Sequence, residues 1–381
     1  MSRRALAPLL LLVGGCASAP PAGRTAAPGA PGSAPFSAPP AAAHEIRVSV
    51  DTRAAQEILG SLNRARFDMT DVKILEDMLP VKLTIQDSGR PADVFEHDFR
   101  AAWDPETRTA VFDFASVRRE KEKWSVVLAA VSSGREEIEH EAAARAAALL
   151  PGDRAISAKL AVFITFGVAG LADHLLATTP DGTPAIVIDL ARVLGEGEVG
   201  SPSNQITRLV RLISGSAYAQ AWSVYREGSA AWKRPMPALG PLEPLVRVVA
   251  EAGPVSIFGV EDSFFPLSTW LTQPMQRAIN ELNRMGERII ESEGDLDVRI
   301  MLTSEVKKPD FARRIGGPAG AYMEDGIIQV FGLDVLRGAL AAGPLAFFQQ
   351  YERATRQDKN LPMLSKVLED RLARAAAPAP H

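Results

Sequence analysis

Cysteine is almost absent from this sequence of 381 residues, which contains a single one, Cys16. One cysteine excludes a disulfide within the chain, a cysteine-rich metal site and a catalytic cysteine in any domain that follows it. The chain also has no large excess of charge of one sign, because its 42 Lys and Arg nearly balance its 46 Asp and Glu, which gives a formal net charge of −4. Without a basic excess, the composition gives no indication of nucleic-acid binding. Beyond the N-terminal segment, no apolar run is long enough to span a membrane.

Motifs of several common enzyme classes are missing as well. The sequence has no Gly-Lys-Ser/Thr of a phosphate-binding loop and no Gly-x-Ser-x-Gly of a serine hydrolase. The five histidines stand at positions 44, 97, 140, 174 and 381, and no two are four residues apart. His140-Glu141 begins like the zinc signature His-Glu-x-x-His, but the second histidine is replaced by Ala144. The sequence therefore predicts no bound metal ion and no cofactor.

Two further segments match binding motifs in outline only. Gly195-Glu-Gly-Glu-Val-Gly200 has the glycine spacing of a dinucleotide fingerprint, but its two glutamates would lie where a pyrophosphate approaches the backbone. We expect a flexible acidic loop there. The acidic run from Glu293 to Asp297 lacks the ligand spacing of an EF-hand and is expected to be a turn.

The N-terminus is the most informative segment. Arg3 and Arg4 precede an apolar run over residues 6–13, which is typical of a signal peptide. Val13-Gly14-Gly15-Cys16 follows at once and resembles the lipobox of bacterial lipoproteins. We therefore expect residues 1–15 to be a signal peptide and Cys16 to receive palmitate and related lipid, which anchors the chain to a membrane.

Two details of this signal bear on export and sorting. Ala17 follows the cysteine where Asp would retain a lipoprotein at the inner membrane, so resemblance to enterobacterial sorting favours the outer membrane of the cell envelope. The paired arginines partly match a twin-arginine signal, but the n-region is very short and favours general secretion. Both routes stay open.

The rest of the chain divides by composition. Residues 16–43 contain little besides Ala, Pro, Gly and Ser and are expected to be an extended tether. Residues 44–374 are expected to form the folded domain, with a possible sub-boundary near residue 150, and residues 375–381 a disordered tail. Within the domain, residues 45–50, 160–166 and 185–190 have strand patterns, and Asp51 is a plausible helix N-cap.

Most of the domain has helical spacing of its apolar residues. The expected helices cover residues 54–62, 94–103, 125–150, 205–226, 242–252, 272–291, 319–331, 333–341, 345–356 and 361–374. We see no alternating strand–helix pattern of the kind that builds a parallel sheet. The sequence therefore predicts an α+β fold, predominantly helical, with a small sheet.

The order of these elements resembles a known family. Strands near residues 163–167 and 186–190, a long helix at 205–226 and the sequence Val248-Val-Ala-Glu-Ala-Gly253 come in that order. The ending has the spacing Ala321-Tyr-Met, Ile328, Phe331-Gly332, Leu336, Leu340, Gly343-Pro, Phe347-Phe, Tyr351. Over residues 45–360 this pattern resembles the gluzincin-like zinc-dependent peptidases of bacteria. The resemblance implies that the long helix would carry His-Glu-x-x-His and that Glu251 matches the position of the third zinc ligand.

The chain departs from that family at the residues that bind the metal. Residues 210–222, VRLISGSAYAQAW, contain no His, Asp, Glu or Cys. Glu251 alone does not hold zinc, which takes three protein ligands in catalytic sites, and it can equally be a partly exposed helix residue. We therefore expect a non-catalytic domain whose former groove, near Ser214, Tyr218, Glu251 and Tyr322, binds a peptide or protein partner.

Two alternatives belong to other classes of protein. The first is an active metal-dependent hydrolase with ligands that the motifs do not reveal, for example His140 or His174 with distant carboxylates. The second is a structural lipoprotein of the cell envelope with no ligand.

Overall fold

The computed structural model describes residues 43–91, 93–104, 106–107, 109, 111–168, 174–195, 202–257 and 269–377. They fall within one unit, Phe36–His381. Cys16, the expected signal peptide, nearly all of the expected tether and the acidic segment from Glu196 to Gly200 lie outside the described residues. None of the helices within these ranges combines the length and the apolar character that a membrane crossing requires.

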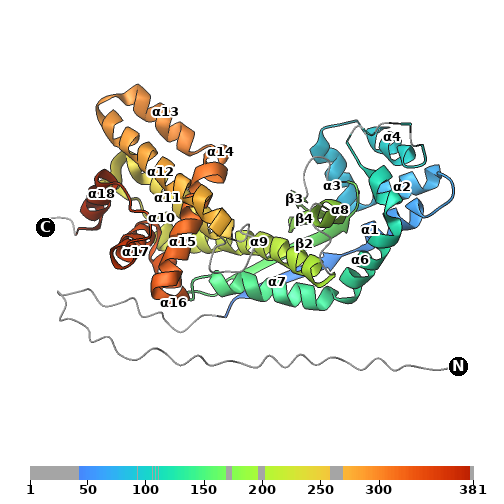
Figure 1. The fold of residues 1–381 in the computed structure, drawn as a ribbon, viewed down its shortest axis with the longest axis horizontal. Coiled ribbons are helices and arrows are strands. Elements are labelled where there is room, and N and C mark those ends of the chain that lie inside the picture. Colours follow the sequence, from blue (N-terminus) through green and yellow to red (C-terminus); the bar gives the residue numbers. More distant parts are fainter. Residues whose placement is uncertain are drawn as a thin grey trace. The chain divides into compact units, whose positions relative to one another are not determined.

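Helices dominate the fold, and one small sheet accompanies them, so the predicted α+β, predominantly helical class is confirmed (Figure 1). Between the first two strands lie α1 (Arg53–Leu62), α2 (Met69–Asp77), α3 (Leu79–Ser88), α4 (Asp93–Ala101), α5 (Phe114–Arg119), α6 (Lys121–Ser133) and α7 (Arg135–Leu149). After the last strand lie α8 (Leu190–Gly195), α9 (Pro202–Gly228), α10 (Ala230–Lys233), α11 (Glu243–Ser256), α12 (Thr269–Glu291), α13 (Leu296–Val306), α14 (Pro309–Phe311), α15 (Gly317–Phe331), α16 (Leu333–Ala342), α17 (Pro344–Gln357) and α18 (Lys366–Ala376).

The sheet is mostly parallel, which corrects the sequence-based expectation. Its order is β1 (Glu45–Asp51), β2 (Ser157–Thr165), β4 (Pro184–Asp189) and β3 (His174–Thr178). β1 pairs with β2 and β2 with β4 in parallel, whereas β3 pairs with β4 antiparallel. The sequence does not indicate the parallel arrangement, because seven helices separate β1 from β2 and no short strand–helix alternation marks it. The sequence does not indicate β3 either, since it is an edge strand and one of its apolar residues, Leu176, is 64% exposed.

Several element ends differ from their predicted positions for local reasons. Asp51 ends β1 and does not cap α1; its carboxylate accepts a hydrogen bond from the backbone N–H of Arg53 at 2.9 Å. The helix predicted over 125–150 is two helices that meet at Gly134. The last helix extends to Ala376, into the predicted tail. In place of the turn predicted over residues 293–297, a short 3-10 helix (Ser292–Gly294) ends there, and Asp295 caps α13.

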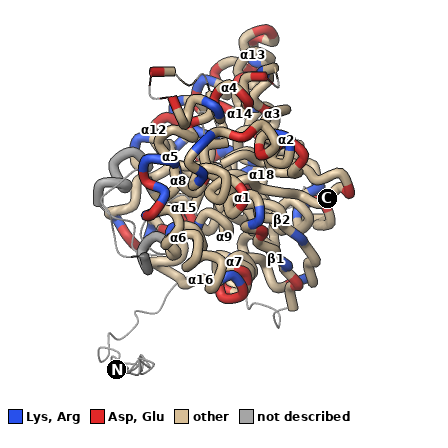
Figure 2. The backbone as a smooth tube through the Cα atoms, turned by 90° about the vertical axis from the view of Figure 1, so that its right-hand side faces the viewer, with Lys and Arg blue, Asp and Glu red and all other residues tan. Residues whose placement is uncertain are grey.

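α9 links the sheet to the C-terminal helices. It packs against α7 and β2 and also contacts α11 (Figure 1). Leu209, Ile213 and Ala217, which repeat at helical spacing, are buried along it. Over the described helices, positions of Lys and Arg are interspersed with those of Asp and Glu (Figure 2).

α11 and α15 approach each other closely. Gly253 of α11 and Gly320 of α15 face each other at the crossing, and a Cβ placed on Gly320 would lie 2.6 Å from the Cα of Gly253. The same Cβ would lie 2.5 Å from the backbone oxygen of Val249. Only glycine fits such backbone-to-backbone contact, so the two glycines set the distance between these helices.

Candidate functional site

The predicted groove residues lie on three helices, of which α11 contacts both of the others. α9 carries Ser214 and Tyr218, and both side chains are fully buried. The Ser214 hydroxyl donates to the backbone oxygen of Val210 at 2.6 Å, so it is already used within its own helix. Tyr322 on α15 is only 6% exposed. The predicted groove is therefore not open at these three positions, because their side chains belong to the helix core.

Aromatic rings fill the part of α9 where the resemblance to zinc peptidases would place metal ligands. Tyr218, Trp222 and Tyr225 stack in succession, with ring centroids 6.1 Å and then 5.4 Å apart. Their spacing of four and three residues puts all three rings on one face of the helix. The Trp222 indole donates to the backbone oxygen of Glu251 at 3.0 Å, which ties α9 to α11. Burial, and then the nearby Glu324, raise the pKa of Tyr218 well above its ordinary value, so its hydroxyl stays protonated.

Glu251 is paired with a cation from α9. One of its carboxylate oxygens lies 3.0 Å from a guanidinium nitrogen of Arg226, and the two side chains are 31% and 25% exposed. The Arg226 guanidinium also lies 5.9 Å from the centre of the Trp222 ring. Glu251, which the sequence suggested as a zinc ligand, is thus paired with an arginine.

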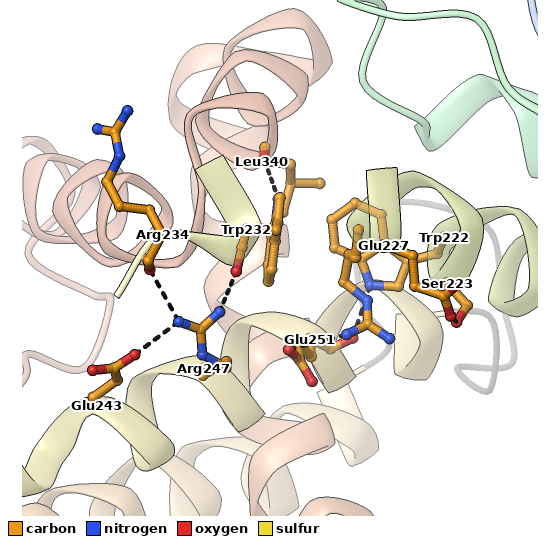
Figure 3. A network of polar contacts seen from close by, with 10 residues as sticks. Trp222, Ser223, Glu227, Trp232, Arg234, Glu243, Arg247, Glu251 and Leu340 are labelled. Carbon is orange, nitrogen blue, oxygen red and sulfur yellow. Dashed lines mark hydrogen bonds and ion pairs between the residues drawn. The ribbon is translucent and has the colours of Figure 1, made fainter. Parts of the chain in front are cut away.

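A second ion pair on α11 joins the helix to the segment after α10 (Figure 3). Arg247 lies 2.8 Å from Glu243 and donates to the backbone oxygens of Trp232 and Arg234. The Trp232 indole in turn donates to the backbone oxygen of Leu340 at 2.7 Å. These contacts fix the ends of α10, α11 and α16 and leave Arg247 with a structural role.

Glu324 on α15 is a buried ionisable residue that no sequence motif indicated. It is fully buried, and neither carboxylate oxygen has a hydrogen-bond partner among the described residues. Burial raises the pKa of Glu324 well above its ordinary value, which favours the uncharged acid. The one available signal was local: Glu324 stands in a helix whose other residues are mostly small or apolar.

Two more carboxyl groups with raised pKa values lie nearby on α15 and α17, helices that contact each other. Burial raises the pKa of Asp325 to about 6, although one of its oxygens accepts from the Gln329 amide at 2.7 Å. Burial, and then the charge of Glu369, raise the pKa of Glu352 to about 7. The C-terminal helices therefore hold carboxyl groups that bind protons more tightly in the folded chain than in the unfolded one.

A separate cavity of about 270 Å³ lies at the carboxyl-terminal edge of β2 and β4. Such an edge of parallel strands is a frequent place for ligands. The cavity is lined by Gly167 after β2, by Asp189 at the end of β4, and by the beginnings of α5, α6 and α8, namely Asp113, Ser116, Val117, Glu120, Lys123, Trp124, Ala191 and Arg192. These residues come from distant parts of the chain, so no local sequence motif indicates the cavity.

The cavity carries charges of both signs. Asp189 is buried and accepts from the backbone N–H of Ala191 at 3.1 Å. The Lys123 ammonium lies 2.7 Å from Glu120 and 4.2 Å from the centre of the Trp124 ring. Arg192 adds a second cation to the lining. Such a lining suits a small polar ligand that carries both an acidic and a basic group.

The histidines considered as alternative ligands are apart from both sites. His140 is exposed on α7 and His174 lies on the edge strand β3. Within the described ranges, no group of three or more His, Cys, Asp or Glu side chains is arranged to hold a metal ion.

Comparison with known proteins gives no match: no protein-family model, no curated protein and no solved structure is similar to this chain.

Proposed function

We propose that this chain is a lipid-anchored protein of the bacterial cell envelope whose zinc-peptidase-like domain is non-catalytic and binds a peptide or protein partner. The anchor is the lipid on Cys16, and the residue that follows it, Ala17, favours the outer membrane.

The observation that carries the non-catalytic assignment is the ion pair between Arg226 and Glu251. A catalytic zinc takes three protein ligands and an open position. In this domain the equivalent face of α9 presents stacked rings, and the remaining carboxylate has an arginine as its partner at 3.0 Å. Both features support a core that is stabilised by packing and an ion pair without a metal.

Binding of a peptide is supported by the cavity at the sheet edge. Its volume of about 270 Å³ is the size of one or two amino-acid residues, and its lining offers carboxylates and cations together. A chain terminus of a peptide carries one such charged group beside a polar amide, which suits this lining.

The experiment compares two carboxylates of α11 that each pair with an arginine. Glu251→Gln removes the carboxylate at the zinc-ligand position, and Glu243→Gln is the matched control because Glu243 pairs with Arg247 at 2.8 Å with similar exposure. If both are ion pairs only, each variant loses about 0.5–1 kcal/mol of unfolding free energy, and neither changes the metal content. The swapped variant Arg226→Glu with Glu251→Arg should recover part of the loss.

A zinc site predicts a different pattern. Metal would co-purify with the wild type and with Glu243→Gln, and Glu251→Gln alone would lose it. That outcome would refute the non-catalytic assignment.

A further inference from the structure

The cavity at the carboxyl-terminal edge of β2 and β4 has walls that backbone contacts hold in place. Asp189, buried at the end of β4, accepts hydrogen bonds from the backbone N–H groups of Ala191 and Arg192 at 3.1 and 3.4 Å. These bonds fix the first turn of α8 at the end of the strand, beside the cavity. At the end of β2, Gly167 has a φ of +64°, and a Cβ there would lie 3.0 Å from the Phe114 ring. Glycine therefore lets the end of β2 contact the start of α5.

Four of the five charged side chains that line the cavity already have partners. Asp189 accepts from α8, and Asp113 accepts from a backbone N–H of α5 at 3.1 Å. Glu120 and Lys123 pair with each other at 2.7 Å. The fifth charged side chain is that of Arg192, which is partly buried, and no ion pair or hydrogen bond of its guanidinium occurs within the part of the chain that the structure describes. The charge of the lining that is left without a partner there is thus a cation.

An unpaired guanidinium in a partly enclosed cavity favours an anionic ligand, because burial without a counter-ion is costly. The guanidinium presents two parallel N–H groups that match the two oxygens of a carboxylate. A phosphate carries more negative charge, and the three carboxylates of the lining would repel it more strongly. Those carboxylates accept hydrogen bonds, which the backbone amides of a peptide donate. The lining therefore suits one carboxylate with an amide beside it.

The apolar part of the lining indicates what else the ligand carries. Val117 and Trp124 are buried, and Ala191 and Gly167 contribute no large side chain. Together with the volume of about 270 Å³, this leaves room for a small apolar side chain.

We propose that this cavity binds the C-terminal carboxylate of a peptide, which pairs with the guanidinium of Arg192, and that the last residue of the peptide has a small side chain. This inference rests on the proposed peptide-binding function, and it names the end of the peptide that enters the cavity.

Three small ligands distinguish the groups that the cavity could bind. N-acetyl-alanyl-alanine has a free carboxylate, its C-terminal amide has none, and free alanine has a carboxylate and an ammonium group. Each is titrated calorimetrically into the full mature protein and into Arg192→Gln. Arg66→Gln is the matched control, since Arg66 is exposed, lies outside the cavity lining and has no ion pair within the described ranges.

We expect the acetylated acid to bind about tenfold or more tightly than its amide, and Arg192→Gln to abolish this difference. Arg66→Gln should bind both ligands as the wild type does. The melting temperature of Arg192→Gln should be unchanged, because its guanidinium has no contact in the described chain to lose.

The other outcomes overturn the inference in distinguishable ways. Equal binding of acid and amide by the wild type refutes the carboxylate site and leaves the peptide-binding function intact. A preference for the acid that survives in Arg192→Gln refutes the role of Arg192. Tighter binding of free alanine than of the acetylated acid assigns the cavity to amino acids and refutes a peptide end. Failure of all three ligands to bind at millimolar concentrations refutes this inference together with the peptide-binding role of the cavity.

Discussion

A methyl group added at the crossing of α11 and α15 should destabilise the domain. In Gly320→Ala the new Cβ would lie 2.5 Å from the backbone oxygen of Val249 and 2.6 Å from the Cα of Gly253. Backbone atoms cannot rotate away as a side chain can, so the helices must separate. Overpacking of this kind lowers the free energy of unfolding by about 1–3 kcal/mol. The higher helix propensity of alanine offsets up to about 1 kcal/mol of that loss. We expect a net loss of about 1–2 kcal/mol of unfolding free energy.

Gly60→Ala is the matched control for this prediction. Gly60 is exposed inside α1, and a Cβ there would meet nothing within 4 Å. Only the gain in helix propensity remains, so this variant should be more stable by about 0.5–1 kcal/mol. Denaturant unfolding followed by circular dichroism measures both. Equal or greater stability of Gly320→Ala relative to Gly60→Ala would refute the close approach of α11 and α15.

The remaining predictions concern protonation and the anchor. Burial raises the pKa of Asp325 to about 6 and that of Glu352 to about 7, so the folded chain keeps protons that the unfolded chain releases above about pH 4–5. The free energy of unfolding should therefore fall as the pH rises from about 4.5 to 7, by at most about 1.4 kcal/mol per pH unit for each group. Glu352→Gln should make this decline less steep. A free energy of unfolding that does not change with pH would count against buried carboxyl groups. Radiolabelled palmitate should enter the wild type but not Cys16→Ser, and equal labelling of both would end the lipoprotein assignment.

The long helices could be predicted from the sequence because their apolar residues repeat along one face. α9, α12 and α17 lie close to their predicted positions for this reason. The parallel pairing of β1 with β2 could not be predicted, since the partners are more than 100 residues apart and pairing is decided by packing across that distance.

In the candidate sites, too, some features are visible in the sequence and others arise only from tertiary packing. The absence of His, Asp, Glu and Cys over residues 210–222 is visible in the sequence, but the partner of Glu251 is not, because Arg226 reaches it only once α9 and α11 cross. Glutamate is ordinarily a surface residue, and only the packing of helices around α15 buries the side chain of Glu324. Charged residues that are neutralised or enclosed by distant elements leave no local pattern.

We propose that this domain holds no catalytic zinc, and the zinc content of the purified protein tests this proposal most directly. Elemental analysis after dialysis should find far less than one zinc per chain. A chelator should leave the melting temperature unchanged, because apolar packing and the Arg226–Glu251 ion pair stabilise the helices without a metal. Stoichiometric zinc that survives dialysis, together with peptide hydrolysis that a chelator abolishes, would contradict the account and favour an active hydrolase.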